Sequence, residues 1–325
     1  MAAQAMPLDS YTQRFLERLA ATNRSSAPAQ TLSDRRAALQ QLLAFACHAE
    51  EVRGVEERTI PGAVGPLRAR LYTPLEPSEQ ILPGLIYFHG GGLVAGSLES
   101  HDPICRAIAN ASGCRLISID YRLAPEAPFP AAVEDGRAAT RWIAEHAQEI
   151  HLDPRRLGLC GDSAGATLAA VVSQSLGDSE EVGLAFQFLL CPIVDFGAET
   201  SSRRNFGQGY FLEEATLASD LSYYLGPSGN PLDPRISPLR ATDFSRLPPS
   251  CIHTAEFDPL RDEGEAYAHR LRSVGMKVIC RRHPGMIHMF YGMGTLIPYA
   301  KRAYELMGTD IRSMLAETTS AGDSP

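Results

Sequence analysis

Short apolar runs alternate with segments of helical periodicity along most of the chain. The runs fall at 67–72, 85–88, 115–120, 157–160, 185–190, 250–254 and 277–282. Most are continuously apolar, which is typical of strands buried on both faces of a mostly parallel sheet. Helical spacing falls between and after them, at 101–112, 131–148, 166–176, 263–274 and 297–317. This alternation predicts an α/β fold, a doubly wound sheet with right-handed crossovers.

Two regions depart from this alternation. Residues 7–50 predict two helices and no strand, and residues 196–246 form a long interruption that contains glycine, proline and aromatic residues. A structureless loop of about fifty residues is abnormal in a compact domain. We therefore expect residues 1–50 and 196–246 to form a helical cap over a core of residues 51–195 and 247–325.

A serine lies between small residues at the junction of a predicted strand and a predicted helix, in the sequence Gly-Asp-Ser-Ala-Gly at 161–165. This is the G-x-S-x-G pattern of a nucleophile elbow, a turn so sharp that only small neighbours let strand and helix pass closely. The N-terminus of the following helix would direct its unpaired amides at a developing anion. The pattern alone also fits a serine in an ordinary loop.

Three consecutive glycines follow the predicted strand at 85–88, in the sequence His-Gly-Gly-Gly at 89–92. Without side chains, their backbone amides can converge on one point, as the oxyanion of acyl transfer requires. We expect the amides of Gly91, Gly92 and Ala164 to form this oxyanion hole. A phosphate-binding loop is the alternative, but the chain has no G-x-x-x-x-G-K-[ST] motif.

Composition narrows the class of protein. The 325 residues are 44% hydrophobic, with 30 basic and 38 acidic residues and a net charge of -8. With no long single-sign run, this balance argues against nucleic acid or an anionic membrane as a partner. The start of the chain shows no secretory signal pattern, and the longest apolar stretch, 185–194, is about half the length of a membrane helix. We expect a cytoplasmic protein.

The cysteine and histidine patterns indicate no metal site. Seven cysteines are scattered without C-x-x-C spacing, which suits buried thiols in a reducing compartment better than a disulfide or zinc framework. The histidines likewise show no metal-ligand spacing. We therefore expect no metal.

Five motifs in order resemble one known family. They are residues 89–92, the run 120–135 with Tyr-Arg-Leu-Ala-Pro-Glu, residues 161–165, Asp-Pro-Leu-Arg-Asp-Glu at 258–263, and Gly-Met-Ile-His at 285–288. The chain resembles the bacterial hormone-sensitive-lipase-like (family IV) carboxylesterases, GDSAG subgroup, over about residues 67–314. The resemblance implies an α/β-hydrolase fold, with a mostly parallel central sheet, helices on both faces and a helical cap, and suggests a homodimer.

The resemblance also implies the catalytic residues. These are Ser163 as nucleophile, Asp258 as acid and His288 as base, in the chain order expected of this fold. Asp258 lies just past the predicted strand at 250–254, and His288 lies in the loop after 277–282, so both would reach the sheet edge of the elbow. Asp195 and Asp262 are alternatives for the acid, although Asp262 better suits the first turn of a helix. His283 is the alternative for the base.

The implied activity is hydrolysis of small-molecule esters with short to medium acyl chains, through an acyl-enzyme intermediate and with no metal or organic cofactor. An amidase, lactonase or carbamate hydrolase would use the same residues. A non-catalytic ligand-binding relative is the other alternative, which the presence of His288 disfavours.

The substrate pocket is the least defined part of the sequence. Leu93 stands where many relatives carry an aromatic residue, and Phe206, Tyr210 and Phe211 either line the pocket or pack the predicted cap onto the core. Asp162, beside the predicted nucleophile, is interpreted as a packing residue of the loop.

Overall fold

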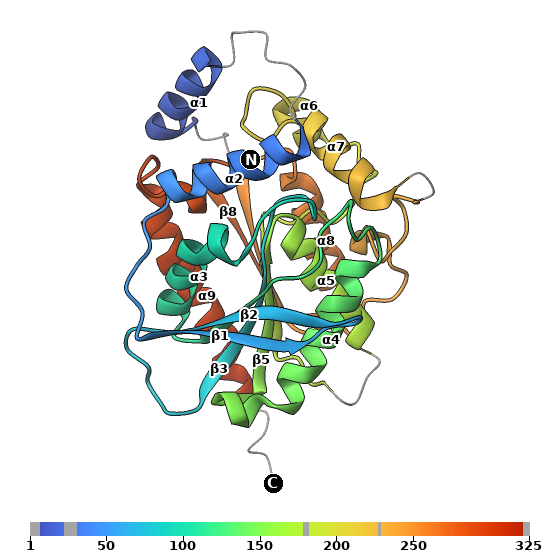
Figure 1. Ribbon diagram of the computed structural model, residues 1–325. Helices are drawn as coiled ribbons and strands as arrows, with labels where there is room; N and C mark the ends of the chain where they lie inside the picture. The colour runs from blue at the N-terminus through green and yellow to red at the C-terminus, as the bar shows by residue number, and fades with distance from the viewer. Residues whose placement is uncertain (1–6, 23–30, 178–181, 227–228, 321–325) are drawn as a thin grey trace.

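A mixed β-sheet of eight strands runs through the centre of the computed structural model, which describes residues 7–22, 31–177, 182–226 and 229–320 (Figure 1). The strands are β1 (Gly54–Pro61), β2 (Pro66–Thr73), β3 (Leu82–Phe88), β4 (Arg115–Ile119), β5 (Leu152–Asp162), β6 (Phe186–Leu190), β7 (Ser250–Phe257) and β8 (Val278–Ile287). Their order across the sheet is β1-β2-β4-β3-β5-β6-β7-β8. The pairs β1/β2 and β2/β4 are antiparallel, and the pairs from β4 to β8 are parallel.

Helices cover both faces of the sheet (Figure 1). One face carries α3 (Leu98–Ser112) and α9 (Tyr299–Ser320), and the other carries α4 (Ala131–Glu145), α5 (Ala164–Leu176) and α8 (Arg261–Ser273). Short 3-10 turns lie at η1 (Ala147–Ile150), η2 (Pro238–Arg240) and η3 (Phe290–Met293). The predicted fold class is confirmed, since this is an α/β-hydrolase fold with a mostly parallel sheet.

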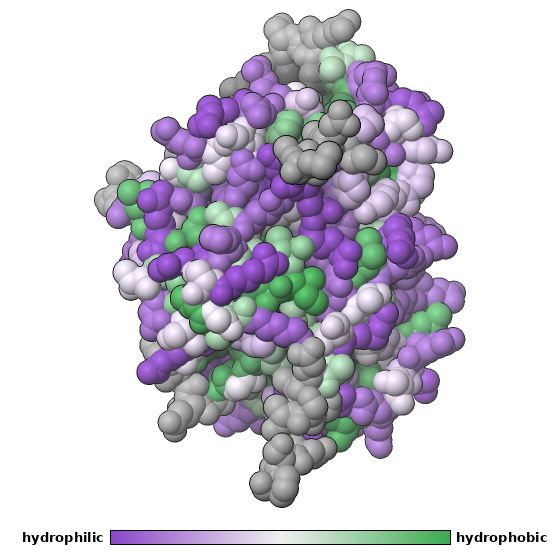
Figure 2. All heavy atoms as spheres, turned by 180° about the vertical axis from the view of Figure 1, so that it is seen from behind, coloured by the Kyte–Doolittle hydropathy of each residue, from purple (hydrophilic) through white to green (hydrophobic). Residues whose placement is uncertain are grey.

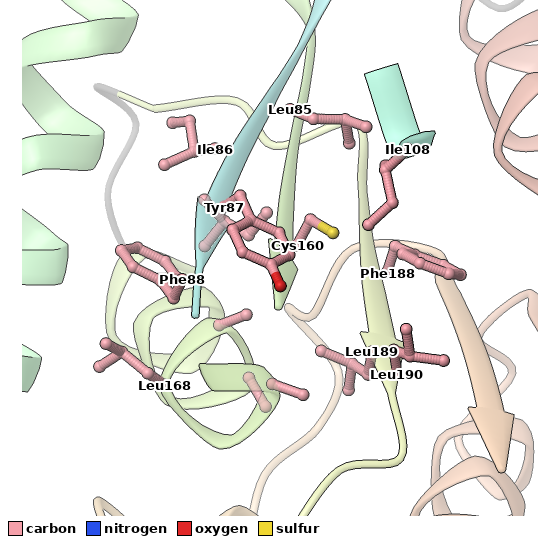
Figure 3. Packing of buried hydrophobic residues seen from close by; sticks show 14 of the residues in the cluster. Leu85, Ile86, Tyr87, Phe88, Ile108, Cys160, Leu168, Phe188, Leu189 and Leu190 are labelled. Carbon is pink, nitrogen blue, oxygen red and sulfur yellow. The ribbon is translucent and has the colours of Figure 1, made fainter. Parts of the chain in front are cut away.

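The core explains why the central strands read as continuous apolar runs. Every residue of β3 is buried. Figure 3 shows its side chains pointing alternately to the two faces, with Phe88 on the side of Leu168 from α5 and Tyr87 on the opposite side. Both faces of the strand therefore need apolar residues, because each is covered by a helix layer.

Four helices gather at one end of the sheet, at the top of Figure 1: α1 (Ser10–Thr22), α2 (Leu32–Ala46), α6 (Ser201–Phe206) and α7 (Glu214–Leu225). We call them the end helices. They come from the two regions where the strand–helix alternation fails. These two regions are in contact, since Phe15 of α1 packs on Phe211, between α6 and α7, with ring centroids 5.7 Å apart. No described helix is both long enough and apolar enough to cross a membrane, and on the face in Figure 2 hydrophobic residues lie in small groups among hydrophilic ones.

The apolar runs do not predict β1, and several of them end before the strands do. In β1 only Ile60 is buried, so this edge strand lacks an apolar run. β8 continues through Pro284 and Gly285 to Ile287, where Gly285 takes a φ of 73° and the register with β7 shifts. His288 therefore follows β8 directly. The prediction that the strand ends at residue 282 and that a loop leads to His288 is wrong.

A buried ion pair anchors α6 to the core. Arg203 Nε donates to Glu263 Oε2 at 2.8 Å, and Glu263 Oε1 accepts from the backbone amides of Val194 and Asp195. The Glu263 side chain is fully buried and that of Arg203 nearly so. Burial raises the pKa of Glu263, and Arg203 and the two amides oppose that rise.

We predict that Arg203→Met lowers the free energy of unfolding by about 3–5 kcal/mol at neutral pH, because it leaves a buried carboxylate without its counter-charge. Arg203 opposes the rise that burial causes in the pKa of Glu263, so its removal raises that pKa further and lets the variant neutralise Glu263 by protonation as pH falls. The loss should therefore be smaller at about pH 5.5 than at about pH 8. Urea unfolding at both pH values measures this. Arg204→Met, at an exposed neighbour on the same helix, is the control; equal losses in the two variants would contradict the prediction.

Candidate active site

Three side chains from the ends of three parallel strands meet in a hydrogen-bonded chain. His288 Nε2 lies 3.0 Å from Ser163 Oγ, and His288 Nδ1 lies 2.8 Å from Asp258 Oδ2. Ser163 follows β5, Asp258 follows β7 and His288 follows β8. All three are buried, with Ser163 the most exposed at 7%. A serine hydroxyl in contact with an imidazole that a carboxylate orients is the arrangement of an activated nucleophile.

The backbone at Ser163 is strained. Its φ of 52° and ψ of -123° place it in a region that non-glycine residues rarely adopt, at a cost of about 1–3 kcal/mol. The flanking glycines make the turn possible. A Cβ on Gly161 would collide with the Gly165 backbone, and one on Gly165 would collide with the carbonyls of Phe88 and His89.

The glycine loop after β3 offers unpaired amides beside the serine. Gly91 and Gly92 have φ values of 119° and 70°. Within the described residues, the amides of Gly91, Gly92 and Ala164 donate to no acceptor. An anion bound among them would therefore receive donors that need not first leave another partner.

Asp162 joins the elbow to the glycine loop. Its fully buried Oδ1 accepts from the Gly90 amide at 2.8 Å and from the Tyr87 hydroxyl, and Oδ2 accepts from the Tyr291 hydroxyl at 3.0 Å. His101 Nε2 stands 3.7 Å from Oδ2, an electrostatic contact that is too long for a hydrogen bond. Burial alone would raise the pKa of Asp162, but His101 and the hydrogen bonds outweigh it and hold the pKa at about 2.

The buried thiol of Cys191 lies near the carboxylate of Asp258, with ligand atoms of the two residues within 4.8 Å of each other. Asp258 Oδ1 accepts from the Leu260 amide at 2.9 Å. Burial, and then the charge of Asp258, raise the pKa of Cys191, so the thiol stays protonated. Neither Cys191 nor the network of Asp162 was found from the sequence.

The alternative acid and base residues lie elsewhere. Asp195 pairs with Arg240 at 2.9 Å. Asp262 lies in the first turn of α8 and accepts from the Ser202 amide. His283 lies inside β8, where Nε2 contacts His253 at 3.0 Å and Nδ1 contacts the Tyr299 hydroxyl at 3.2 Å. Burial and the neighbouring His253 lower the pKa of His283 to about 3.

The four predicted pocket residues separate into three places. Leu93 is buried directly after the glycine loop. Phe206 and Tyr210 pack against each other and against Phe257, the residue before Asp258. Phe211 instead contacts α1 through Phe15.

Two buried groups in the described chain have ligand atoms close enough to hold a metal ion. Cys191, Asp258 and His288 form one, and Cys251, His253 and Asp310 form the other. In the first group, Asp258 Oδ2 contacts His288 Nδ1, and His288 Nε2 contacts Ser163 Oγ. In the second, Asp310 already accepts from Arg281 and His253. Protein donors thus already occupy both carboxylates.

Comparison with known proteins identifies the family. A family model described as alpha/beta hydrolase fold matches residues 85–292. Esterase LipI of Mycobacterium tuberculosis is 37% identical over 77% of this chain and 78% of its own length. The ethyl acetate hydrolase of Pseudomonas putida is 38% identical over 72% of this chain and 74% of its own length.

A solved ester hydrolase from the metagenome of Lake Arreo superimposes with a TM-score of 0.91 at 40% identity, covering 95% of this chain and 99% of the other. The chain belongs to the hormone-sensitive-lipase-like esterases of the α/β-hydrolase superfamily. The esterase is a carboxylic ester hydrolase, and its relatives indicate that its substrates are esters.

We predict that Asp162→Ala lowers kcat of the esterase for p-nitrophenyl acetate by about 10–100-fold. The Gly90 amide loses its acceptor, so the amides of the glycine loop are no longer held in position beside Ser163. Asp162→Asn keeps an acceptor oxygen for that amide and should lose less. Steady-state kinetics with both variants measures the difference.

Tyr291→Phe is the control for this pair, since it removes one donor to Asp162 without touching the bond to Gly90. A kcat of Asp162→Ala equal to that of the unmodified esterase would contradict the role given to Asp162.

Proposed function

We propose that Ser163 is the nucleophile, His288 the base and Asp258 the acid of this carboxylesterase. The observation that carries the proposal is the unbroken chain of contacts from Ser163 Oγ through the imidazole to Asp258 Oδ2, at 3.0 and 2.8 Å. Asp258 accepts from Nδ1 and thereby keeps Nε2 free to take the serine proton.

The reaction proceeds in two halves. His288 Nε2 takes the proton of Ser163 as Oγ attacks the ester carbonyl, and then returns it to the departing alcohol as the carbon–oxygen bond breaks. Water attacks the resulting acyl-serine, His288 takes its proton, and the acid leaves as Oγ is protonated again. Amides of Gly91, Gly92 and Ala164 stabilise the oxyanion in each half. Their lack of another acceptor in the described structure supports that role.

The end helices, in this proposal, are the cap of the enzyme, formed by residues 1–50 and 196–246 over a hydrolase core of 51–195 and 247–325. Leu93, Phe206, Tyr210 and Phe211 belong to the substrate pocket. Short to medium acyl chains suit a capped and buried serine, and the similarity to an ethyl acetate hydrolase supports small esters. We assign the chain to the GDSAG subgroup, since an aspartate, Asp162, precedes the proposed nucleophile.

Two further proposals concern the protein in the cell. The free thiols of all seven cysteines suit a reducing compartment, so we assign the enzyme to the cytoplasm, with no nucleic-acid or membrane partner. β8 ends the strand order, and we propose that its outer edge forms a homodimer. No cofactor enters the reaction.

We predict that Ser163→Ala abolishes hydrolysis of p-nitrophenyl acetate and butyrate and that His288→Ala lowers kcat by about 10⁴-fold or more. His283→Ala, which removes a histidine bonded only to His253 and Tyr299 among the described residues, should keep most of the turnover. Initial rates of the purified variants measure this. No turnover by the unmodified enzyme would refute the esterase proposal, and activity retained in Ser163→Ala would refute the site.

A further inference from the structure

The strand β8 leaves its regular pairing with β7 just before His288. The pairs on either side of the break are Ala255 with His283 and Phe257 with Ile287. Glu256 of β7 therefore faces three residues of β8, at 284–286, and β8 bulges at this point. Bulges are common next to active sites, where they re-aim a side chain. This bulge lies directly before the proposed base.

Partners outside the ladder hold the bulge. Glu256 Oε2 accepts from the Gly285 amide at 2.8 Å, and the Gly285 carbonyl accepts from the backbone amide of Asp9 at 3.1 Å. On β7, Arg261 Nη1 donates to the Glu256 carbonyl at 2.8 Å. Both polar backbone groups of Gly285 are thus satisfied although the residue has left the ladder, as buried backbone groups require.

The backbone at Gly285 depends on these partners. Its φ of 73° lies in the left-handed region, and a Cβ there would come within 3.0 Å of the Asp9 amide nitrogen. Pro284, the residue before it, has no amide to donate to a ladder. Glu256 is only 5% exposed, so water competes little for its bond to the Gly285 amide.

The bond between Glu256 and Gly285 lies next to the contact between the proposed acid and base. Asp258 comes two residues after Glu256, and His288 comes three residues after Gly285. Asp258 Oδ2 and His288 Nδ1 are 2.8 Å apart. The two short segments are therefore joined at two points, and the position of the imidazole depends on the shape of the bulge.

We propose that Glu256 is a positioning residue of the esterase: its carboxylate holds the bulge of β8 and thereby holds His288 in contact with Ser163. The inference rests on the proposed function, in which His288 is the base. The acceptor oxygen performs this role rather than the negative charge, because its partner, the Gly285 amide, is neutral. Without that oxygen the buried amide loses its acceptor, and the bulge shifts toward another one.

A displaced imidazole has a signature that a loss of folded enzyme lacks. In the proposed mechanism, His288 returns a proton to the departing alcohol. Ethanolate is a poor leaving group and depends on that proton, whereas p-nitrophenolate leaves readily without it. Ethyl acetate and p-nitrophenyl acetate place the same acetyl group on Ser163. The ratio of their kcat/KM values therefore reports the position of the imidazole and is independent of the fraction of active enzyme.

The experiment measures both kcat/KM values in Glu256→Met and Glu256→Gln. Glu256→Met removes the acceptor and should lower kcat/KM by about 100-fold for ethyl acetate and by about tenfold for p-nitrophenyl acetate, because general acid–base catalysis is impaired. Glu256→Gln keeps an acceptor oxygen and should keep most of the activity toward both esters.

Glu265→Gln is the matched control. Glu265 also binds β8, through Arg282 at 2.7 and 2.6 Å, but it does so before the bulge. This variant loosens the same strand without touching Gly285, so the ratio of the two kcat/KM values should stay that of the unmodified enzyme.

No loss in Glu256→Met, or an equal loss for the two esters, would overturn the inference. An equal shift of the ratio in Glu256→Gln would assign the effect to the charge and would overturn it as well. Should Glu256→Met fail to fold, Gly285→Ala decides. It strains the same bulge and leaves the carboxylate in place, so the ratio should move in the same direction; an unchanged ratio there would contradict the role of Glu256.

The proposed function is tested separately in the same assays. Hydrolysis of both esters by the unmodified enzyme, and its loss in Ser163→Ala and His288→Ala, supports the nucleophile and the base whatever the ratio in Glu256→Met. Activity retained in Ser163→Ala or His288→Ala would refute the proposed function, whereas an unchanged ratio in Glu256→Met refutes only the role of Glu256.

Discussion

The close approach of the β5–α5 turn to the end of β3 is the constraint on which the rest of the site depends. Gly165 lies against the carbonyls of Phe88 and His89, where no side chain fits, because β3 and β5 are neighbouring parallel strands that end at the same edge. Asp162 strengthens this approach by accepting the Gly90 amide. The serine and the glycine amides are thus held at a fixed spacing before any substrate arrives, as electrostatic catalysis requires.

Two buried carboxylates show how this fold manages charge. Asp162 receives three hydrogen bonds and faces His101, and its pKa stays low despite full burial. Glu263 receives two backbone bonds and one from Arg203, and burial still raises its pKa. The comparison indicates that the carboxylate next to the serine is the better compensated one. The negative charge of Asp162 can therefore hold the glycine loop in place, because its hydrogen bonds and His101 outweigh the cost of burying the carboxylate.

The sequence was sufficient for the parts of the protein whose chemistry is local. Continuous apolar runs predict the central strands because both faces of these strands are covered. The residues proposed as catalytic each follow a strand, and these strands end at the same edge of the sheet, so the sequence also predicts that the residues lie close together. The edge strand β1 escaped because only Ile60 is buried. The continuation of β8 past Pro284 and Gly285 depends on the shifted register with β7, which is a tertiary property. The sequence indicates only loop packing for Asp162, because its partners Tyr87 and Tyr291 lie 75 and 129 residues away along the chain.

The surroundings of the glycine loop were beyond sequence reasoning for a related reason. Leu39 and Asp220 reach Gly91 and Gly92 from helices that no motif marks, and Arg35 meets Asp220 across 185 residues. Gly92 takes a left-handed φ and carries no side chain, so the space where a Cβ would stand is open to a residue from α7. The identity of residue 220 therefore sets the charge beside Gly92. A carboxylate at that position would oppose a developing negative charge unless a cation balanced it. Arg35 supplies that balance from the other helix, so the electrostatics of the reaction depend on how the two separate segments of the end helices meet.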